Sequence, residues 1–219
     1  MSNYRRITSL GIIVLISVFI LLNCTKELAR DNLVERNGIY YEINSDKPFS
    51  GKSVSLYANG QQREIAEVKD GKLHGTTKQW YENGQQEFIS GNKDGKLHGT
   101  YKEWYENGQQ KVIGEYRDDK LHGTYKEWYE NGQQRVIGKW TDGKLHGSVK
   151  MWYENGQQEE IAKWKNGETH GTANKWYENG QQKQITEWKH DQRHGTQKKW
   201  YENGQQQEIS EWEDGVRIK

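Results

Sequence analysis

The apolar and polar positions of this chain recur with a fixed period of 24 residues. Two dipeptides mark the period. His-Gly occurs at His74, His98, His122, His146, His170 and His194, and Asn-Gly occurs at Asn59, Asn83, Asn107, Asn131, Asn155, Asn179 and Asn203. Seven units therefore follow one another without insertion from Gly51 to Ile218. A period this regular indicates an array in which each unit packs against its neighbours.

One unit, Gly99 to His122, shows the secondary structure that the pattern predicts. Residues 100–105 are rich in β-branched and aromatic residues, and residues 110–116 form a second such run. Between them, Asn107-Gly108 predicts a tight primed turn, because Asn and Gly tolerate positive φ. Most units have Asp-Gly at the second turn. We therefore expect an all-β fold: an elongated, single-layer antiparallel sheet of tandem 24-residue β-hairpin repeats.

Aromatic columns run through the units and give the candidate interaction surface. Adjacent Trp and Tyr residues on a strand should point to opposite faces, so we expect an aromatic ladder on both faces. The candidate residues are Trp80, Trp104, Trp128, Trp152, Trp176 and Trp200, with Tyr81, Tyr105, Tyr129, Tyr153, Tyr177 and Tyr201. In the second strand an invariant Ile column begins at Ile65, and a smaller residue follows each Ile.

The two ends of the array differ from its middle, as capping units do. Residues 37–50 are predicted to form an N-terminal capping half-repeat, and residues 51–219 the seven repeats. Residues 24–36 are charged and polar, and we interpret them as a tether.

Residues 1–23 have the pattern of an export signal. Arg5 and Arg6 precede an apolar run from Ile7 to Leu22, which is short for a membrane-spanning helix. The following Leu21-Leu22-Asn23-Cys24 resembles a bacterial lipobox, in which the cysteine is lipidated and acyl chains anchor the protein. The alternative is an uncleaved N-terminal anchor. Either interpretation predicts an exported, membrane-anchored protein of the cell envelope.

Composition excludes several classes of protein. Hydrophobic residues make up only 32% of the chain, whereas Trp and Tyr number 10 and 13, so aromatics must supply most of the burial. The net charge of +1 offers no general basic surface, and we expect no nucleic acid partner. The single cysteine rules out an internal disulfide.

The repeat resembles a known family. The run Trp-Tyr-Glu-Asn-Gly-Gln, a short strand and Asp-Gly-Lys-Leu-His-Gly, opened by Lys-Pro-Phe-Ser-Gly, is similar to bacterial MORN-variant repeats over residues 37–219. Many such proteins carry the label "YwqK-family antitoxin". The resemblance implies β-hairpin units in an elongated sheet, a role in protein binding or membrane association, and no enzyme activity in the repeat.

The repeated polar residues do not suggest catalysis. The histidines recur at about 9–10 Å, too far apart to share a metal ion, so we assign them to the turns and expect no metal or other cofactor. One Glu in each Asn-Gly loop gives identical single carboxylates on a surface without a cleft, so we expect no catalytic residue. The Lys column that begins at Lys78 is expected to pair with cross-strand Glu.

These observations predict a non-enzymatic, membrane-anchored repeat scaffold. The expected partner is an unknown protein, a second copy of the chain or a membrane surface. Two alternatives remain open: glycan or cell-wall binding through the Trp and Tyr ladders, and an antitoxin-like or immunity role.

Overall fold

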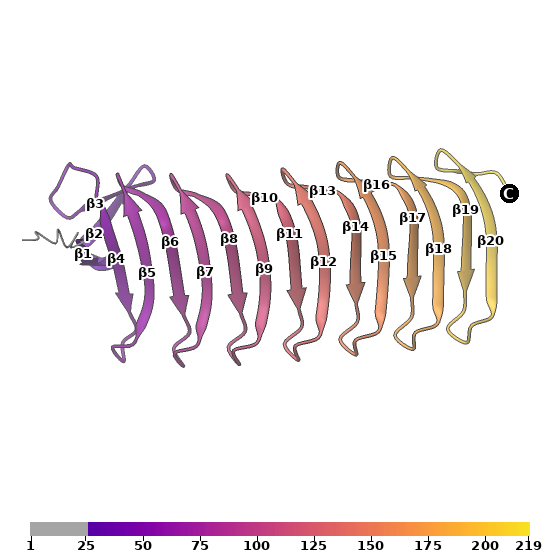
Figure 1. Cartoon of the computed structure of the whole chain (residues 1–219), viewed down its shortest axis with the longest axis horizontal. Coiled ribbons are helices and arrows are strands. Elements are labelled where there is room, and N and C mark those ends of the chain that lie inside the picture. The colour runs from indigo at the N-terminus through magenta and orange to yellow at the C-terminus, as the bar shows by residue number, and fades with distance from the viewer. Residues whose placement is uncertain (1–25) are drawn as a thin grey trace, which may run out of the picture.

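The computed structural model describes residues 26–219, and these form one long row of β-hairpins (Figure 1). The leader at 1–23 and the lipidation candidate Cys24 lie outside the described residues. The seven hairpins are β4 (Gly51–Leu56) with β5 (Gln62–Lys69), β6 (Lys72–Trp80) with β7 (Gln86–Lys93), β8 (Lys96–Trp104) with β9 (Gln110–Arg117), β11 (Gly123–Trp128) with β12 (Gln134–Thr141), β14 (Gly147–Trp152) with β15 (Gln158–Lys165), β17 (Gly171–Trp176) with β18 (Gln182–Lys189), and β19 (Gln192–Trp200) with β20 (Gln206–Glu213).

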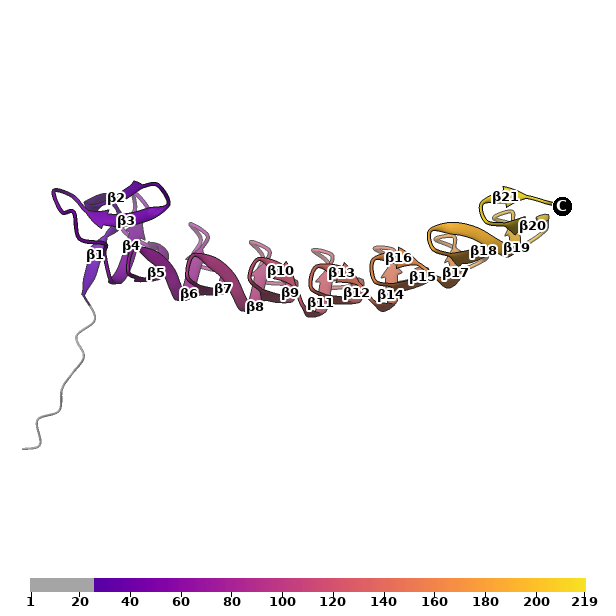
Figure 2. The same ribbon diagram turned by 90° about the horizontal axis from the view of Figure 1, so that it is seen from above.

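The hairpins pair edge to edge in chain order, which confirms the predicted all-β repeat sheet. Figure 2 shows the strands nearly end-on and curved, and within residues 26–219 no second layer covers the seven hairpins. Each hairpin is antiparallel, and β1 alone pairs in parallel, so the whole sheet is mixed. Within residues 26–219 no helix has the length and apolar character needed to cross a membrane.

A bulge at each His-Gly step interrupts the pairing between units. Ala66 pairs with Thr77 and Val68 with Leu73, so one residue of β5 faces three residues of β6. Gly75 lies in this bulge with φ at +102°, a conformation that residues with a Cβ rarely adopt. In some units the bulge separates a short strand from the main one, giving β10 (Lys120–Leu121), β13 (Lys144–Leu145) and β16 (Glu168–Thr169). At the C-terminal end the short strand β21 (Val216–Arg217) pairs with β20.

The prediction of a primed turn at the Asn-Gly loop is wrong. At the Asn-Gly loop only Gly84 has positive φ, and its N–H donates to the carbonyl of Tyr81 (2.9 Å), as in a type I turn. The primed turn is the Asp-Gly turn, where Asp94 (φ +53°) and Gly95 (φ +84°) connect paired Lys residues of β7 and β8. Asn83 instead uses its side-chain oxygen to accept the N–H of Gln85 at 2.9 Å.

The sheet has two chemically different faces. The small-residue face carries the residue after each Ile and its cross-strand partners, and most of the buried side chains lie there: Ser53, Ala66, Thr77, Ser90, Val149, Ala162, Ala173, Thr186, Gln197 and Ser210. The isoleucine face carries the Ile column, the Lys column and the Trp column that ends each first strand.

Aromatic side chains cover the small-residue face in place of a second layer. A Cβ on Gly138 would lie 2.7 Å from the ring of Trp140, so the indole lies directly over the glycine. Tyr125 packs edge-to-face on the same indole, with ring centroids 5.3 Å apart. The small residues in this column therefore make room for the aromatic column two positions later in the same strand.

The N-terminal end is closed by a small cap. β1 (Glu27–Ala29) lies parallel to β4, the 3-10 turn η1 (Arg30–Asn32) follows, and β2 (Leu33–Arg36) pairs with β3 (Ile39–Glu42) in a separate two-stranded sheet. Phe49, 1% exposed, packs with Leu33 and Val68. The structure thus differs from the expected tether at 24–36, because residues 27–36 belong to the folded cap.

The Tyr column lies outside the strands, so the expectation that it forms a ladder on one face is wrong. Each Tyr begins the Asn-Gly loop, and in the first six units its hydroxyl donates to the backbone carbonyl of the Trp in the next unit. The bonds are Tyr57–Trp80 (2.6 Å), Tyr81–Trp104, Tyr105–Trp128 and Tyr153–Trp176 (each 2.8 Å), and Tyr129–Trp152 and Tyr177–Trp200 (each 2.9 Å). The column joins successive units.

This contact predicts a matched pair of stability measurements. Tyr129→Phe removes the hydroxyl that bonds the Trp152 carbonyl, and it should lower the free energy of unfolding by about 1 kcal/mol. Tyr201 is the matched control, because no following unit lies beside its 50% exposed side chain among the described residues. Tyr201→Phe should leave stability unchanged in denaturant titration; equal losses in both variants would contradict the role given to the hydroxyl.

Candidate interaction surface

The predicted Trp residues lie on the isoleucine face, at the end of each first strand. Trp152 follows Lys150 by two residues on β14, and Lys150 lies opposite Ile137 of β12. All six Trp side chains of this column are half-buried, so their rings contact the sheet and still meet solvent. The Trp residues thus remain candidates for ligand contact, whereas the Tyr hydroxyls are engaged between units.

The Lys column does not pair with Glu as expected. Lys78 lies between Ile65 and Ile89 in the two neighbouring strands, and Lys126 lies between Ile113 and Ile137. No ion pair within residues 26–219 involves a Lys of this column. The isoleucine face therefore alternates apolar and cationic side chains across the strands.

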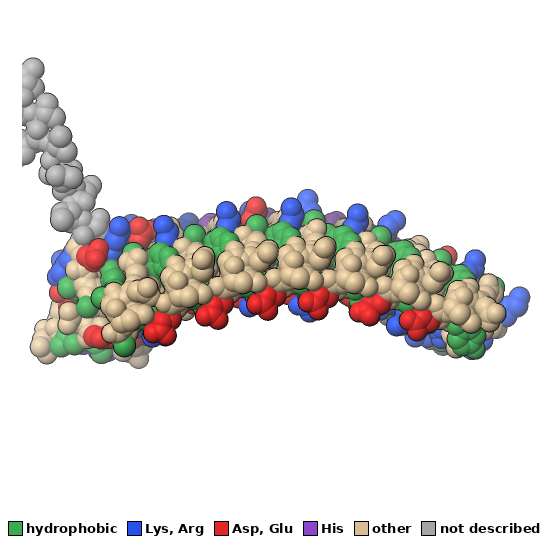
Figure 3. Space-filling view, turned by 90° about the horizontal axis from the view of Figure 1, so that it is seen from below, with side chains coloured by type: hydrophobic (Ala, Val, Ile, Leu, Met, Phe, Trp, Pro, Cys, Tyr) green, Lys and Arg blue, Asp and Glu red, His purple; other side chains and the backbone are tan. Residues whose placement is uncertain are grey.

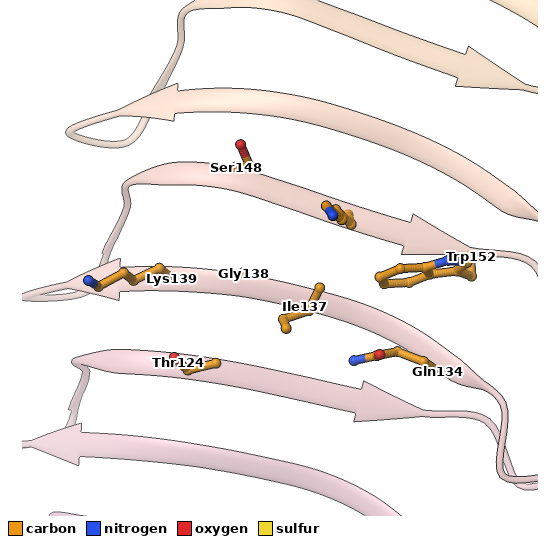
Figure 4. Close-up of a pocket in the computed structure, with 8 residues that line it drawn as sticks. Thr124, Gln134, Ile137, Gly138, Lys139, Ser148 and Trp152 are labelled. Atoms are coloured by element: carbon orange, nitrogen blue, oxygen red, sulfur yellow. The ribbon is translucent and has the colours of Figure 1, made fainter.

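A pocket of about 420 Å³ lies on this face in the middle of the array. Figure 4 shows Ile137 at its centre, with Lys139 further along β12 and Trp152 on β14. Ser148 and Thr124 close the side nearer the His-Gly bulges. Sequence reasoning missed Lys139 and Ser148, although the replacement of Glu by Lys in this column of second strands is visible in the sequence.

Carboxylates on the small-residue face are paired internally. Glu103 accepts bonds from Lys111 (2.6 Å) and from the Tyr101 hydroxyl (2.9 Å). Burial, together with the Glu103 carboxylate, raises the pKa of Tyr101 well above its ordinary value. Burial raises the pKa of Tyr125 to about 12, and the nearby Glu127 carboxylate contributes to the shift. This face is thus satisfied by its own ion pairs.

Four of the six repeated histidines, His74, His98, His122 and His194, contact an aspartate of the following unit. The Nδ1–Oδ1 distance is 3.2 Å for His74 and Asp94, and 3.1 Å for His122 and Asp142. These contacts place the four histidines against the second turn of the next unit, in keeping with the turn role inferred from the sequence. Within residues 26–219, no three His, Cys, Asp or Glu side chains are placed to hold a metal ion.

The two faces also differ in charge. Figure 3 views the array from the side of the Asn-Gly loops and shows an acidic row along one border. Lys and Arg side chains project from the opposite border, next to apolar side chains. A partner that approaches along one face therefore meets a different charge pattern from one that approaches along the other.

Comparison with known proteins agrees with this architecture. Five segments match the family model described as "MORN repeat variant": residues 73–86, 97–118, 121–137, 145–166 and 193–214. No curated protein matches the chain. The matched segments fall within five of the seven hairpins, so these hairpins are similar to repeats of this kind.

The raised pKa of Tyr125 predicts a loss of stability at alkaline pH. Because the folded-state pKa of Tyr125, about 12, exceeds the ordinary value of 10.0, its contribution to stability is fully present below pH 10.0 and is lost as the pH rises through about 12. Titration of its ring signals by NMR should show the late ionisation.

A pair of carboxylate variants checks the cause of this shift. Glu127→Gln should bring the Tyr125 pKa closer to 10.0, because it removes a neighbouring negative charge. Glu154→Gln, in an exposed loop, should not move it. An unchanged Tyr125 pKa in Glu127→Gln would show that the carboxylate makes no contribution.

Proposed function

We propose that this array of MORN-variant repeats is a non-enzymatic scaffold that binds a protein partner through its isoleucine face. The observation that carries the proposal is the central pocket, where Ile137 and Trp152 remain accessible between unpaired lysines. Apolar side chains that stay exposed on a regular surface are typical of interaction sites. The small-residue face is a poorer candidate, because its aromatic side chains cover its own backbone and its charges pair internally.

The proposed location is the outer side of a membrane. It is supported by the sequence pattern of an apolar leader followed by Cys24. Lipidation at Cys24 would attach the chain beside the N-terminal cap, and the hairpin array would extend from that point. An anchored array of this kind can hold a partner at the membrane surface without catalysing a reaction.

The scaffold role predicts a crosslinking result in intact cells. Crosslinking mass spectrometry of the full chain should recover peptides of one reproducible protein partner joined to lysines of the isoleucine face, such as Lys126 and Lys150. Trp128→Ala should reduce these crosslinks at least tenfold, because it removes an aromatic contact from that face. Trp188→Ala, a half-buried Trp of the small-residue face, is the matched control for loss of stability.

Other outcomes would identify another function. Equal loss of crosslinks in both Trp variants would indicate only a damaged fold. Binding on a glycan array that disappears in Trp128→Ala would establish the cell-wall alternative. A toxic protein that this chain neutralises would establish the antitoxin-like alternative, and a monomer without any crosslinked partner would contradict the scaffold proposal.

A further inference from the structure

One column of the second strands changes charge in the middle of the array. It lies on the isoleucine face, two residues after each Ile. From the first unit to the last it contains Glu67, Gly91, Glu115, Lys139, Lys163, Glu187 and Glu211. The two lysines are therefore confined to the fourth and fifth units, with acidic residues in the flanking units.

The first unit shows what the acidic residue does. The Glu67 carboxylate accepts the backbone N–H of Thr76 at 2.7 Å, inside the His-Gly bulge of the next strand. A Cβ on Gly75 would lie 2.2 Å from the same carboxylate oxygen. Glu67 thus fills the space at the bulge and satisfies a donor that strand pairing leaves free. The pocket that remains beside it has a volume of about 150 Å³.

The central pocket lies at the equivalent position three repeats further along the chain. Each residue that lines the pocket beside Glu67 has an equivalent in the central pocket 72 residues later, which is three periods of 24. The first pocket is lined by Lys52, Ile65, Glu67, Thr76 and Lys78, and the central pocket includes Thr124, Ile137, Lys139, Ser148 and Lys150. The charge differs at two positions, because Lys139 replaces the carboxylate Glu67 and the uncharged Thr124 replaces Lys52; the volume is larger, at about 420 Å³.

The backbone around the central pocket keeps the same register. Thr76 pairs with Gly91 in its hairpin, and Ser148 pairs with Lys163 in the same way. The Ser148 N–H is therefore directed as the Thr76 N–H is, towards the preceding unit. No internal carboxylate is present there, because the side chain in that position is Lys139.

The charges around this position are uncompensated. Lys139, Lys150 and Lys163 are exposed, and no ion pair among the described residues includes them or the half-buried Lys126. The fifth unit repeats the arrangement with Lys163 and Thr172. The two central units therefore present cations and a backbone donor where the first unit presents a donor already bound to its own glutamate.

We propose that the central pocket binds a carboxylate side chain from an acidic segment of a partner protein. The incoming carboxylate takes the place that Glu67 occupies in the first unit: it accepts the Ser148 N–H and pairs with Lys139 or Lys150. An apolar neighbour in the same segment packs on Ile137 and Trp152. The inference rests on the proposed scaffold function and specifies its partner. A carboxylate is favoured over a lipid phosphate because the chain's own occupant of this position is a carboxylate.

The test uses a fluorescent hexaglutamate peptide and the full chain in nonionic detergent at low ionic strength. Anisotropy should report binding that weakens with salt. Lys139→Glu should weaken binding at least tenfold, because the new carboxylate occupies the site from within. The same column holds Glu in four other units, so the fold accommodates this residue. Lys78→Glu makes the same change of charge on the same face and should alter binding less than twofold.

Two further measurements locate the site. In NMR spectra of the full chain, hexaglutamate should shift the Ser148 amide signal and leave the Thr76 signal in place, because Glu67 already holds that amide. The reciprocal variant Glu67→Lys should increase the number of peptides bound per chain. If Lys139→Glu proves unfolded by circular dichroism, the Glu67→Lys result decides the question.

The outcomes separate this inference from the general scaffold role. Equal losses in Lys139→Glu and Lys78→Glu would show nonspecific attraction and overturn the site. Binding to phosphatidylglycerol vesicles without binding to hexaglutamate would assign the pocket to a lipid headgroup and overturn the proposal. Absence of hexaglutamate binding, with cellular crosslinks retained, would overturn the acidic partner while leaving the scaffold function intact.

Discussion

Six loop tyrosines donate a hydrogen bond to the tryptophan carbonyl of the next unit, and these bonds hold the array together where the strand pairing is interrupted. The His-Gly bulge interrupts strand pairing between units: β9 forms two register pairs with β11 and two with β10, whereas it forms six with β8 in its own hairpin. A single-layer sheet has no second layer to compensate. The tyrosine hydroxyls add a contact at the far end of each unit, and Asn side chains such as Asn131, which donates to the Glu154 carbonyl at 2.9 Å, add another.

The sequence was sufficient to predict the hairpins because their signals are local and repeated. A 24-residue period with alternating strand and turn residues leaves few folds other than a tandem β array, and the structure confirms this. The side of the sheet on which Tyr129 lies was not predictable in the same way. Alternation places neighbours on opposite faces only while both belong to a strand, and the strand ends at Trp128.

The turn type at Asn-Gly was predicted wrongly for a related reason. Asn-Gly is a strong signal for a primed turn, yet Asn107 uses its side chain to accept the N–H of Gln109 and to donate to the carbonyl of Glu130. Those two bonds favour a longer loop in which only the glycine has positive φ. Contacts with the next unit thus override a local preference for a turn type. These contacts cannot be predicted from the sequence of a single unit.

The role of Lys139 in the candidate site could not be predicted from the sequence for the same reason. The change from Glu to Lys at Lys139 is plain in the sequence, but its meaning depends on the bond between Glu67 and the Thr76 amide, which only the folded bulge creates. In a repeat array each position is built several times, so one copy can serve as the reference for another. In the first unit the Glu67 carboxylate accepts the bulge amide, and at Lys139 the proposed ligand carboxylate takes that place. Under this proposal, a change of charge in a single column confines recognition to the centre of the array without any change in the fold.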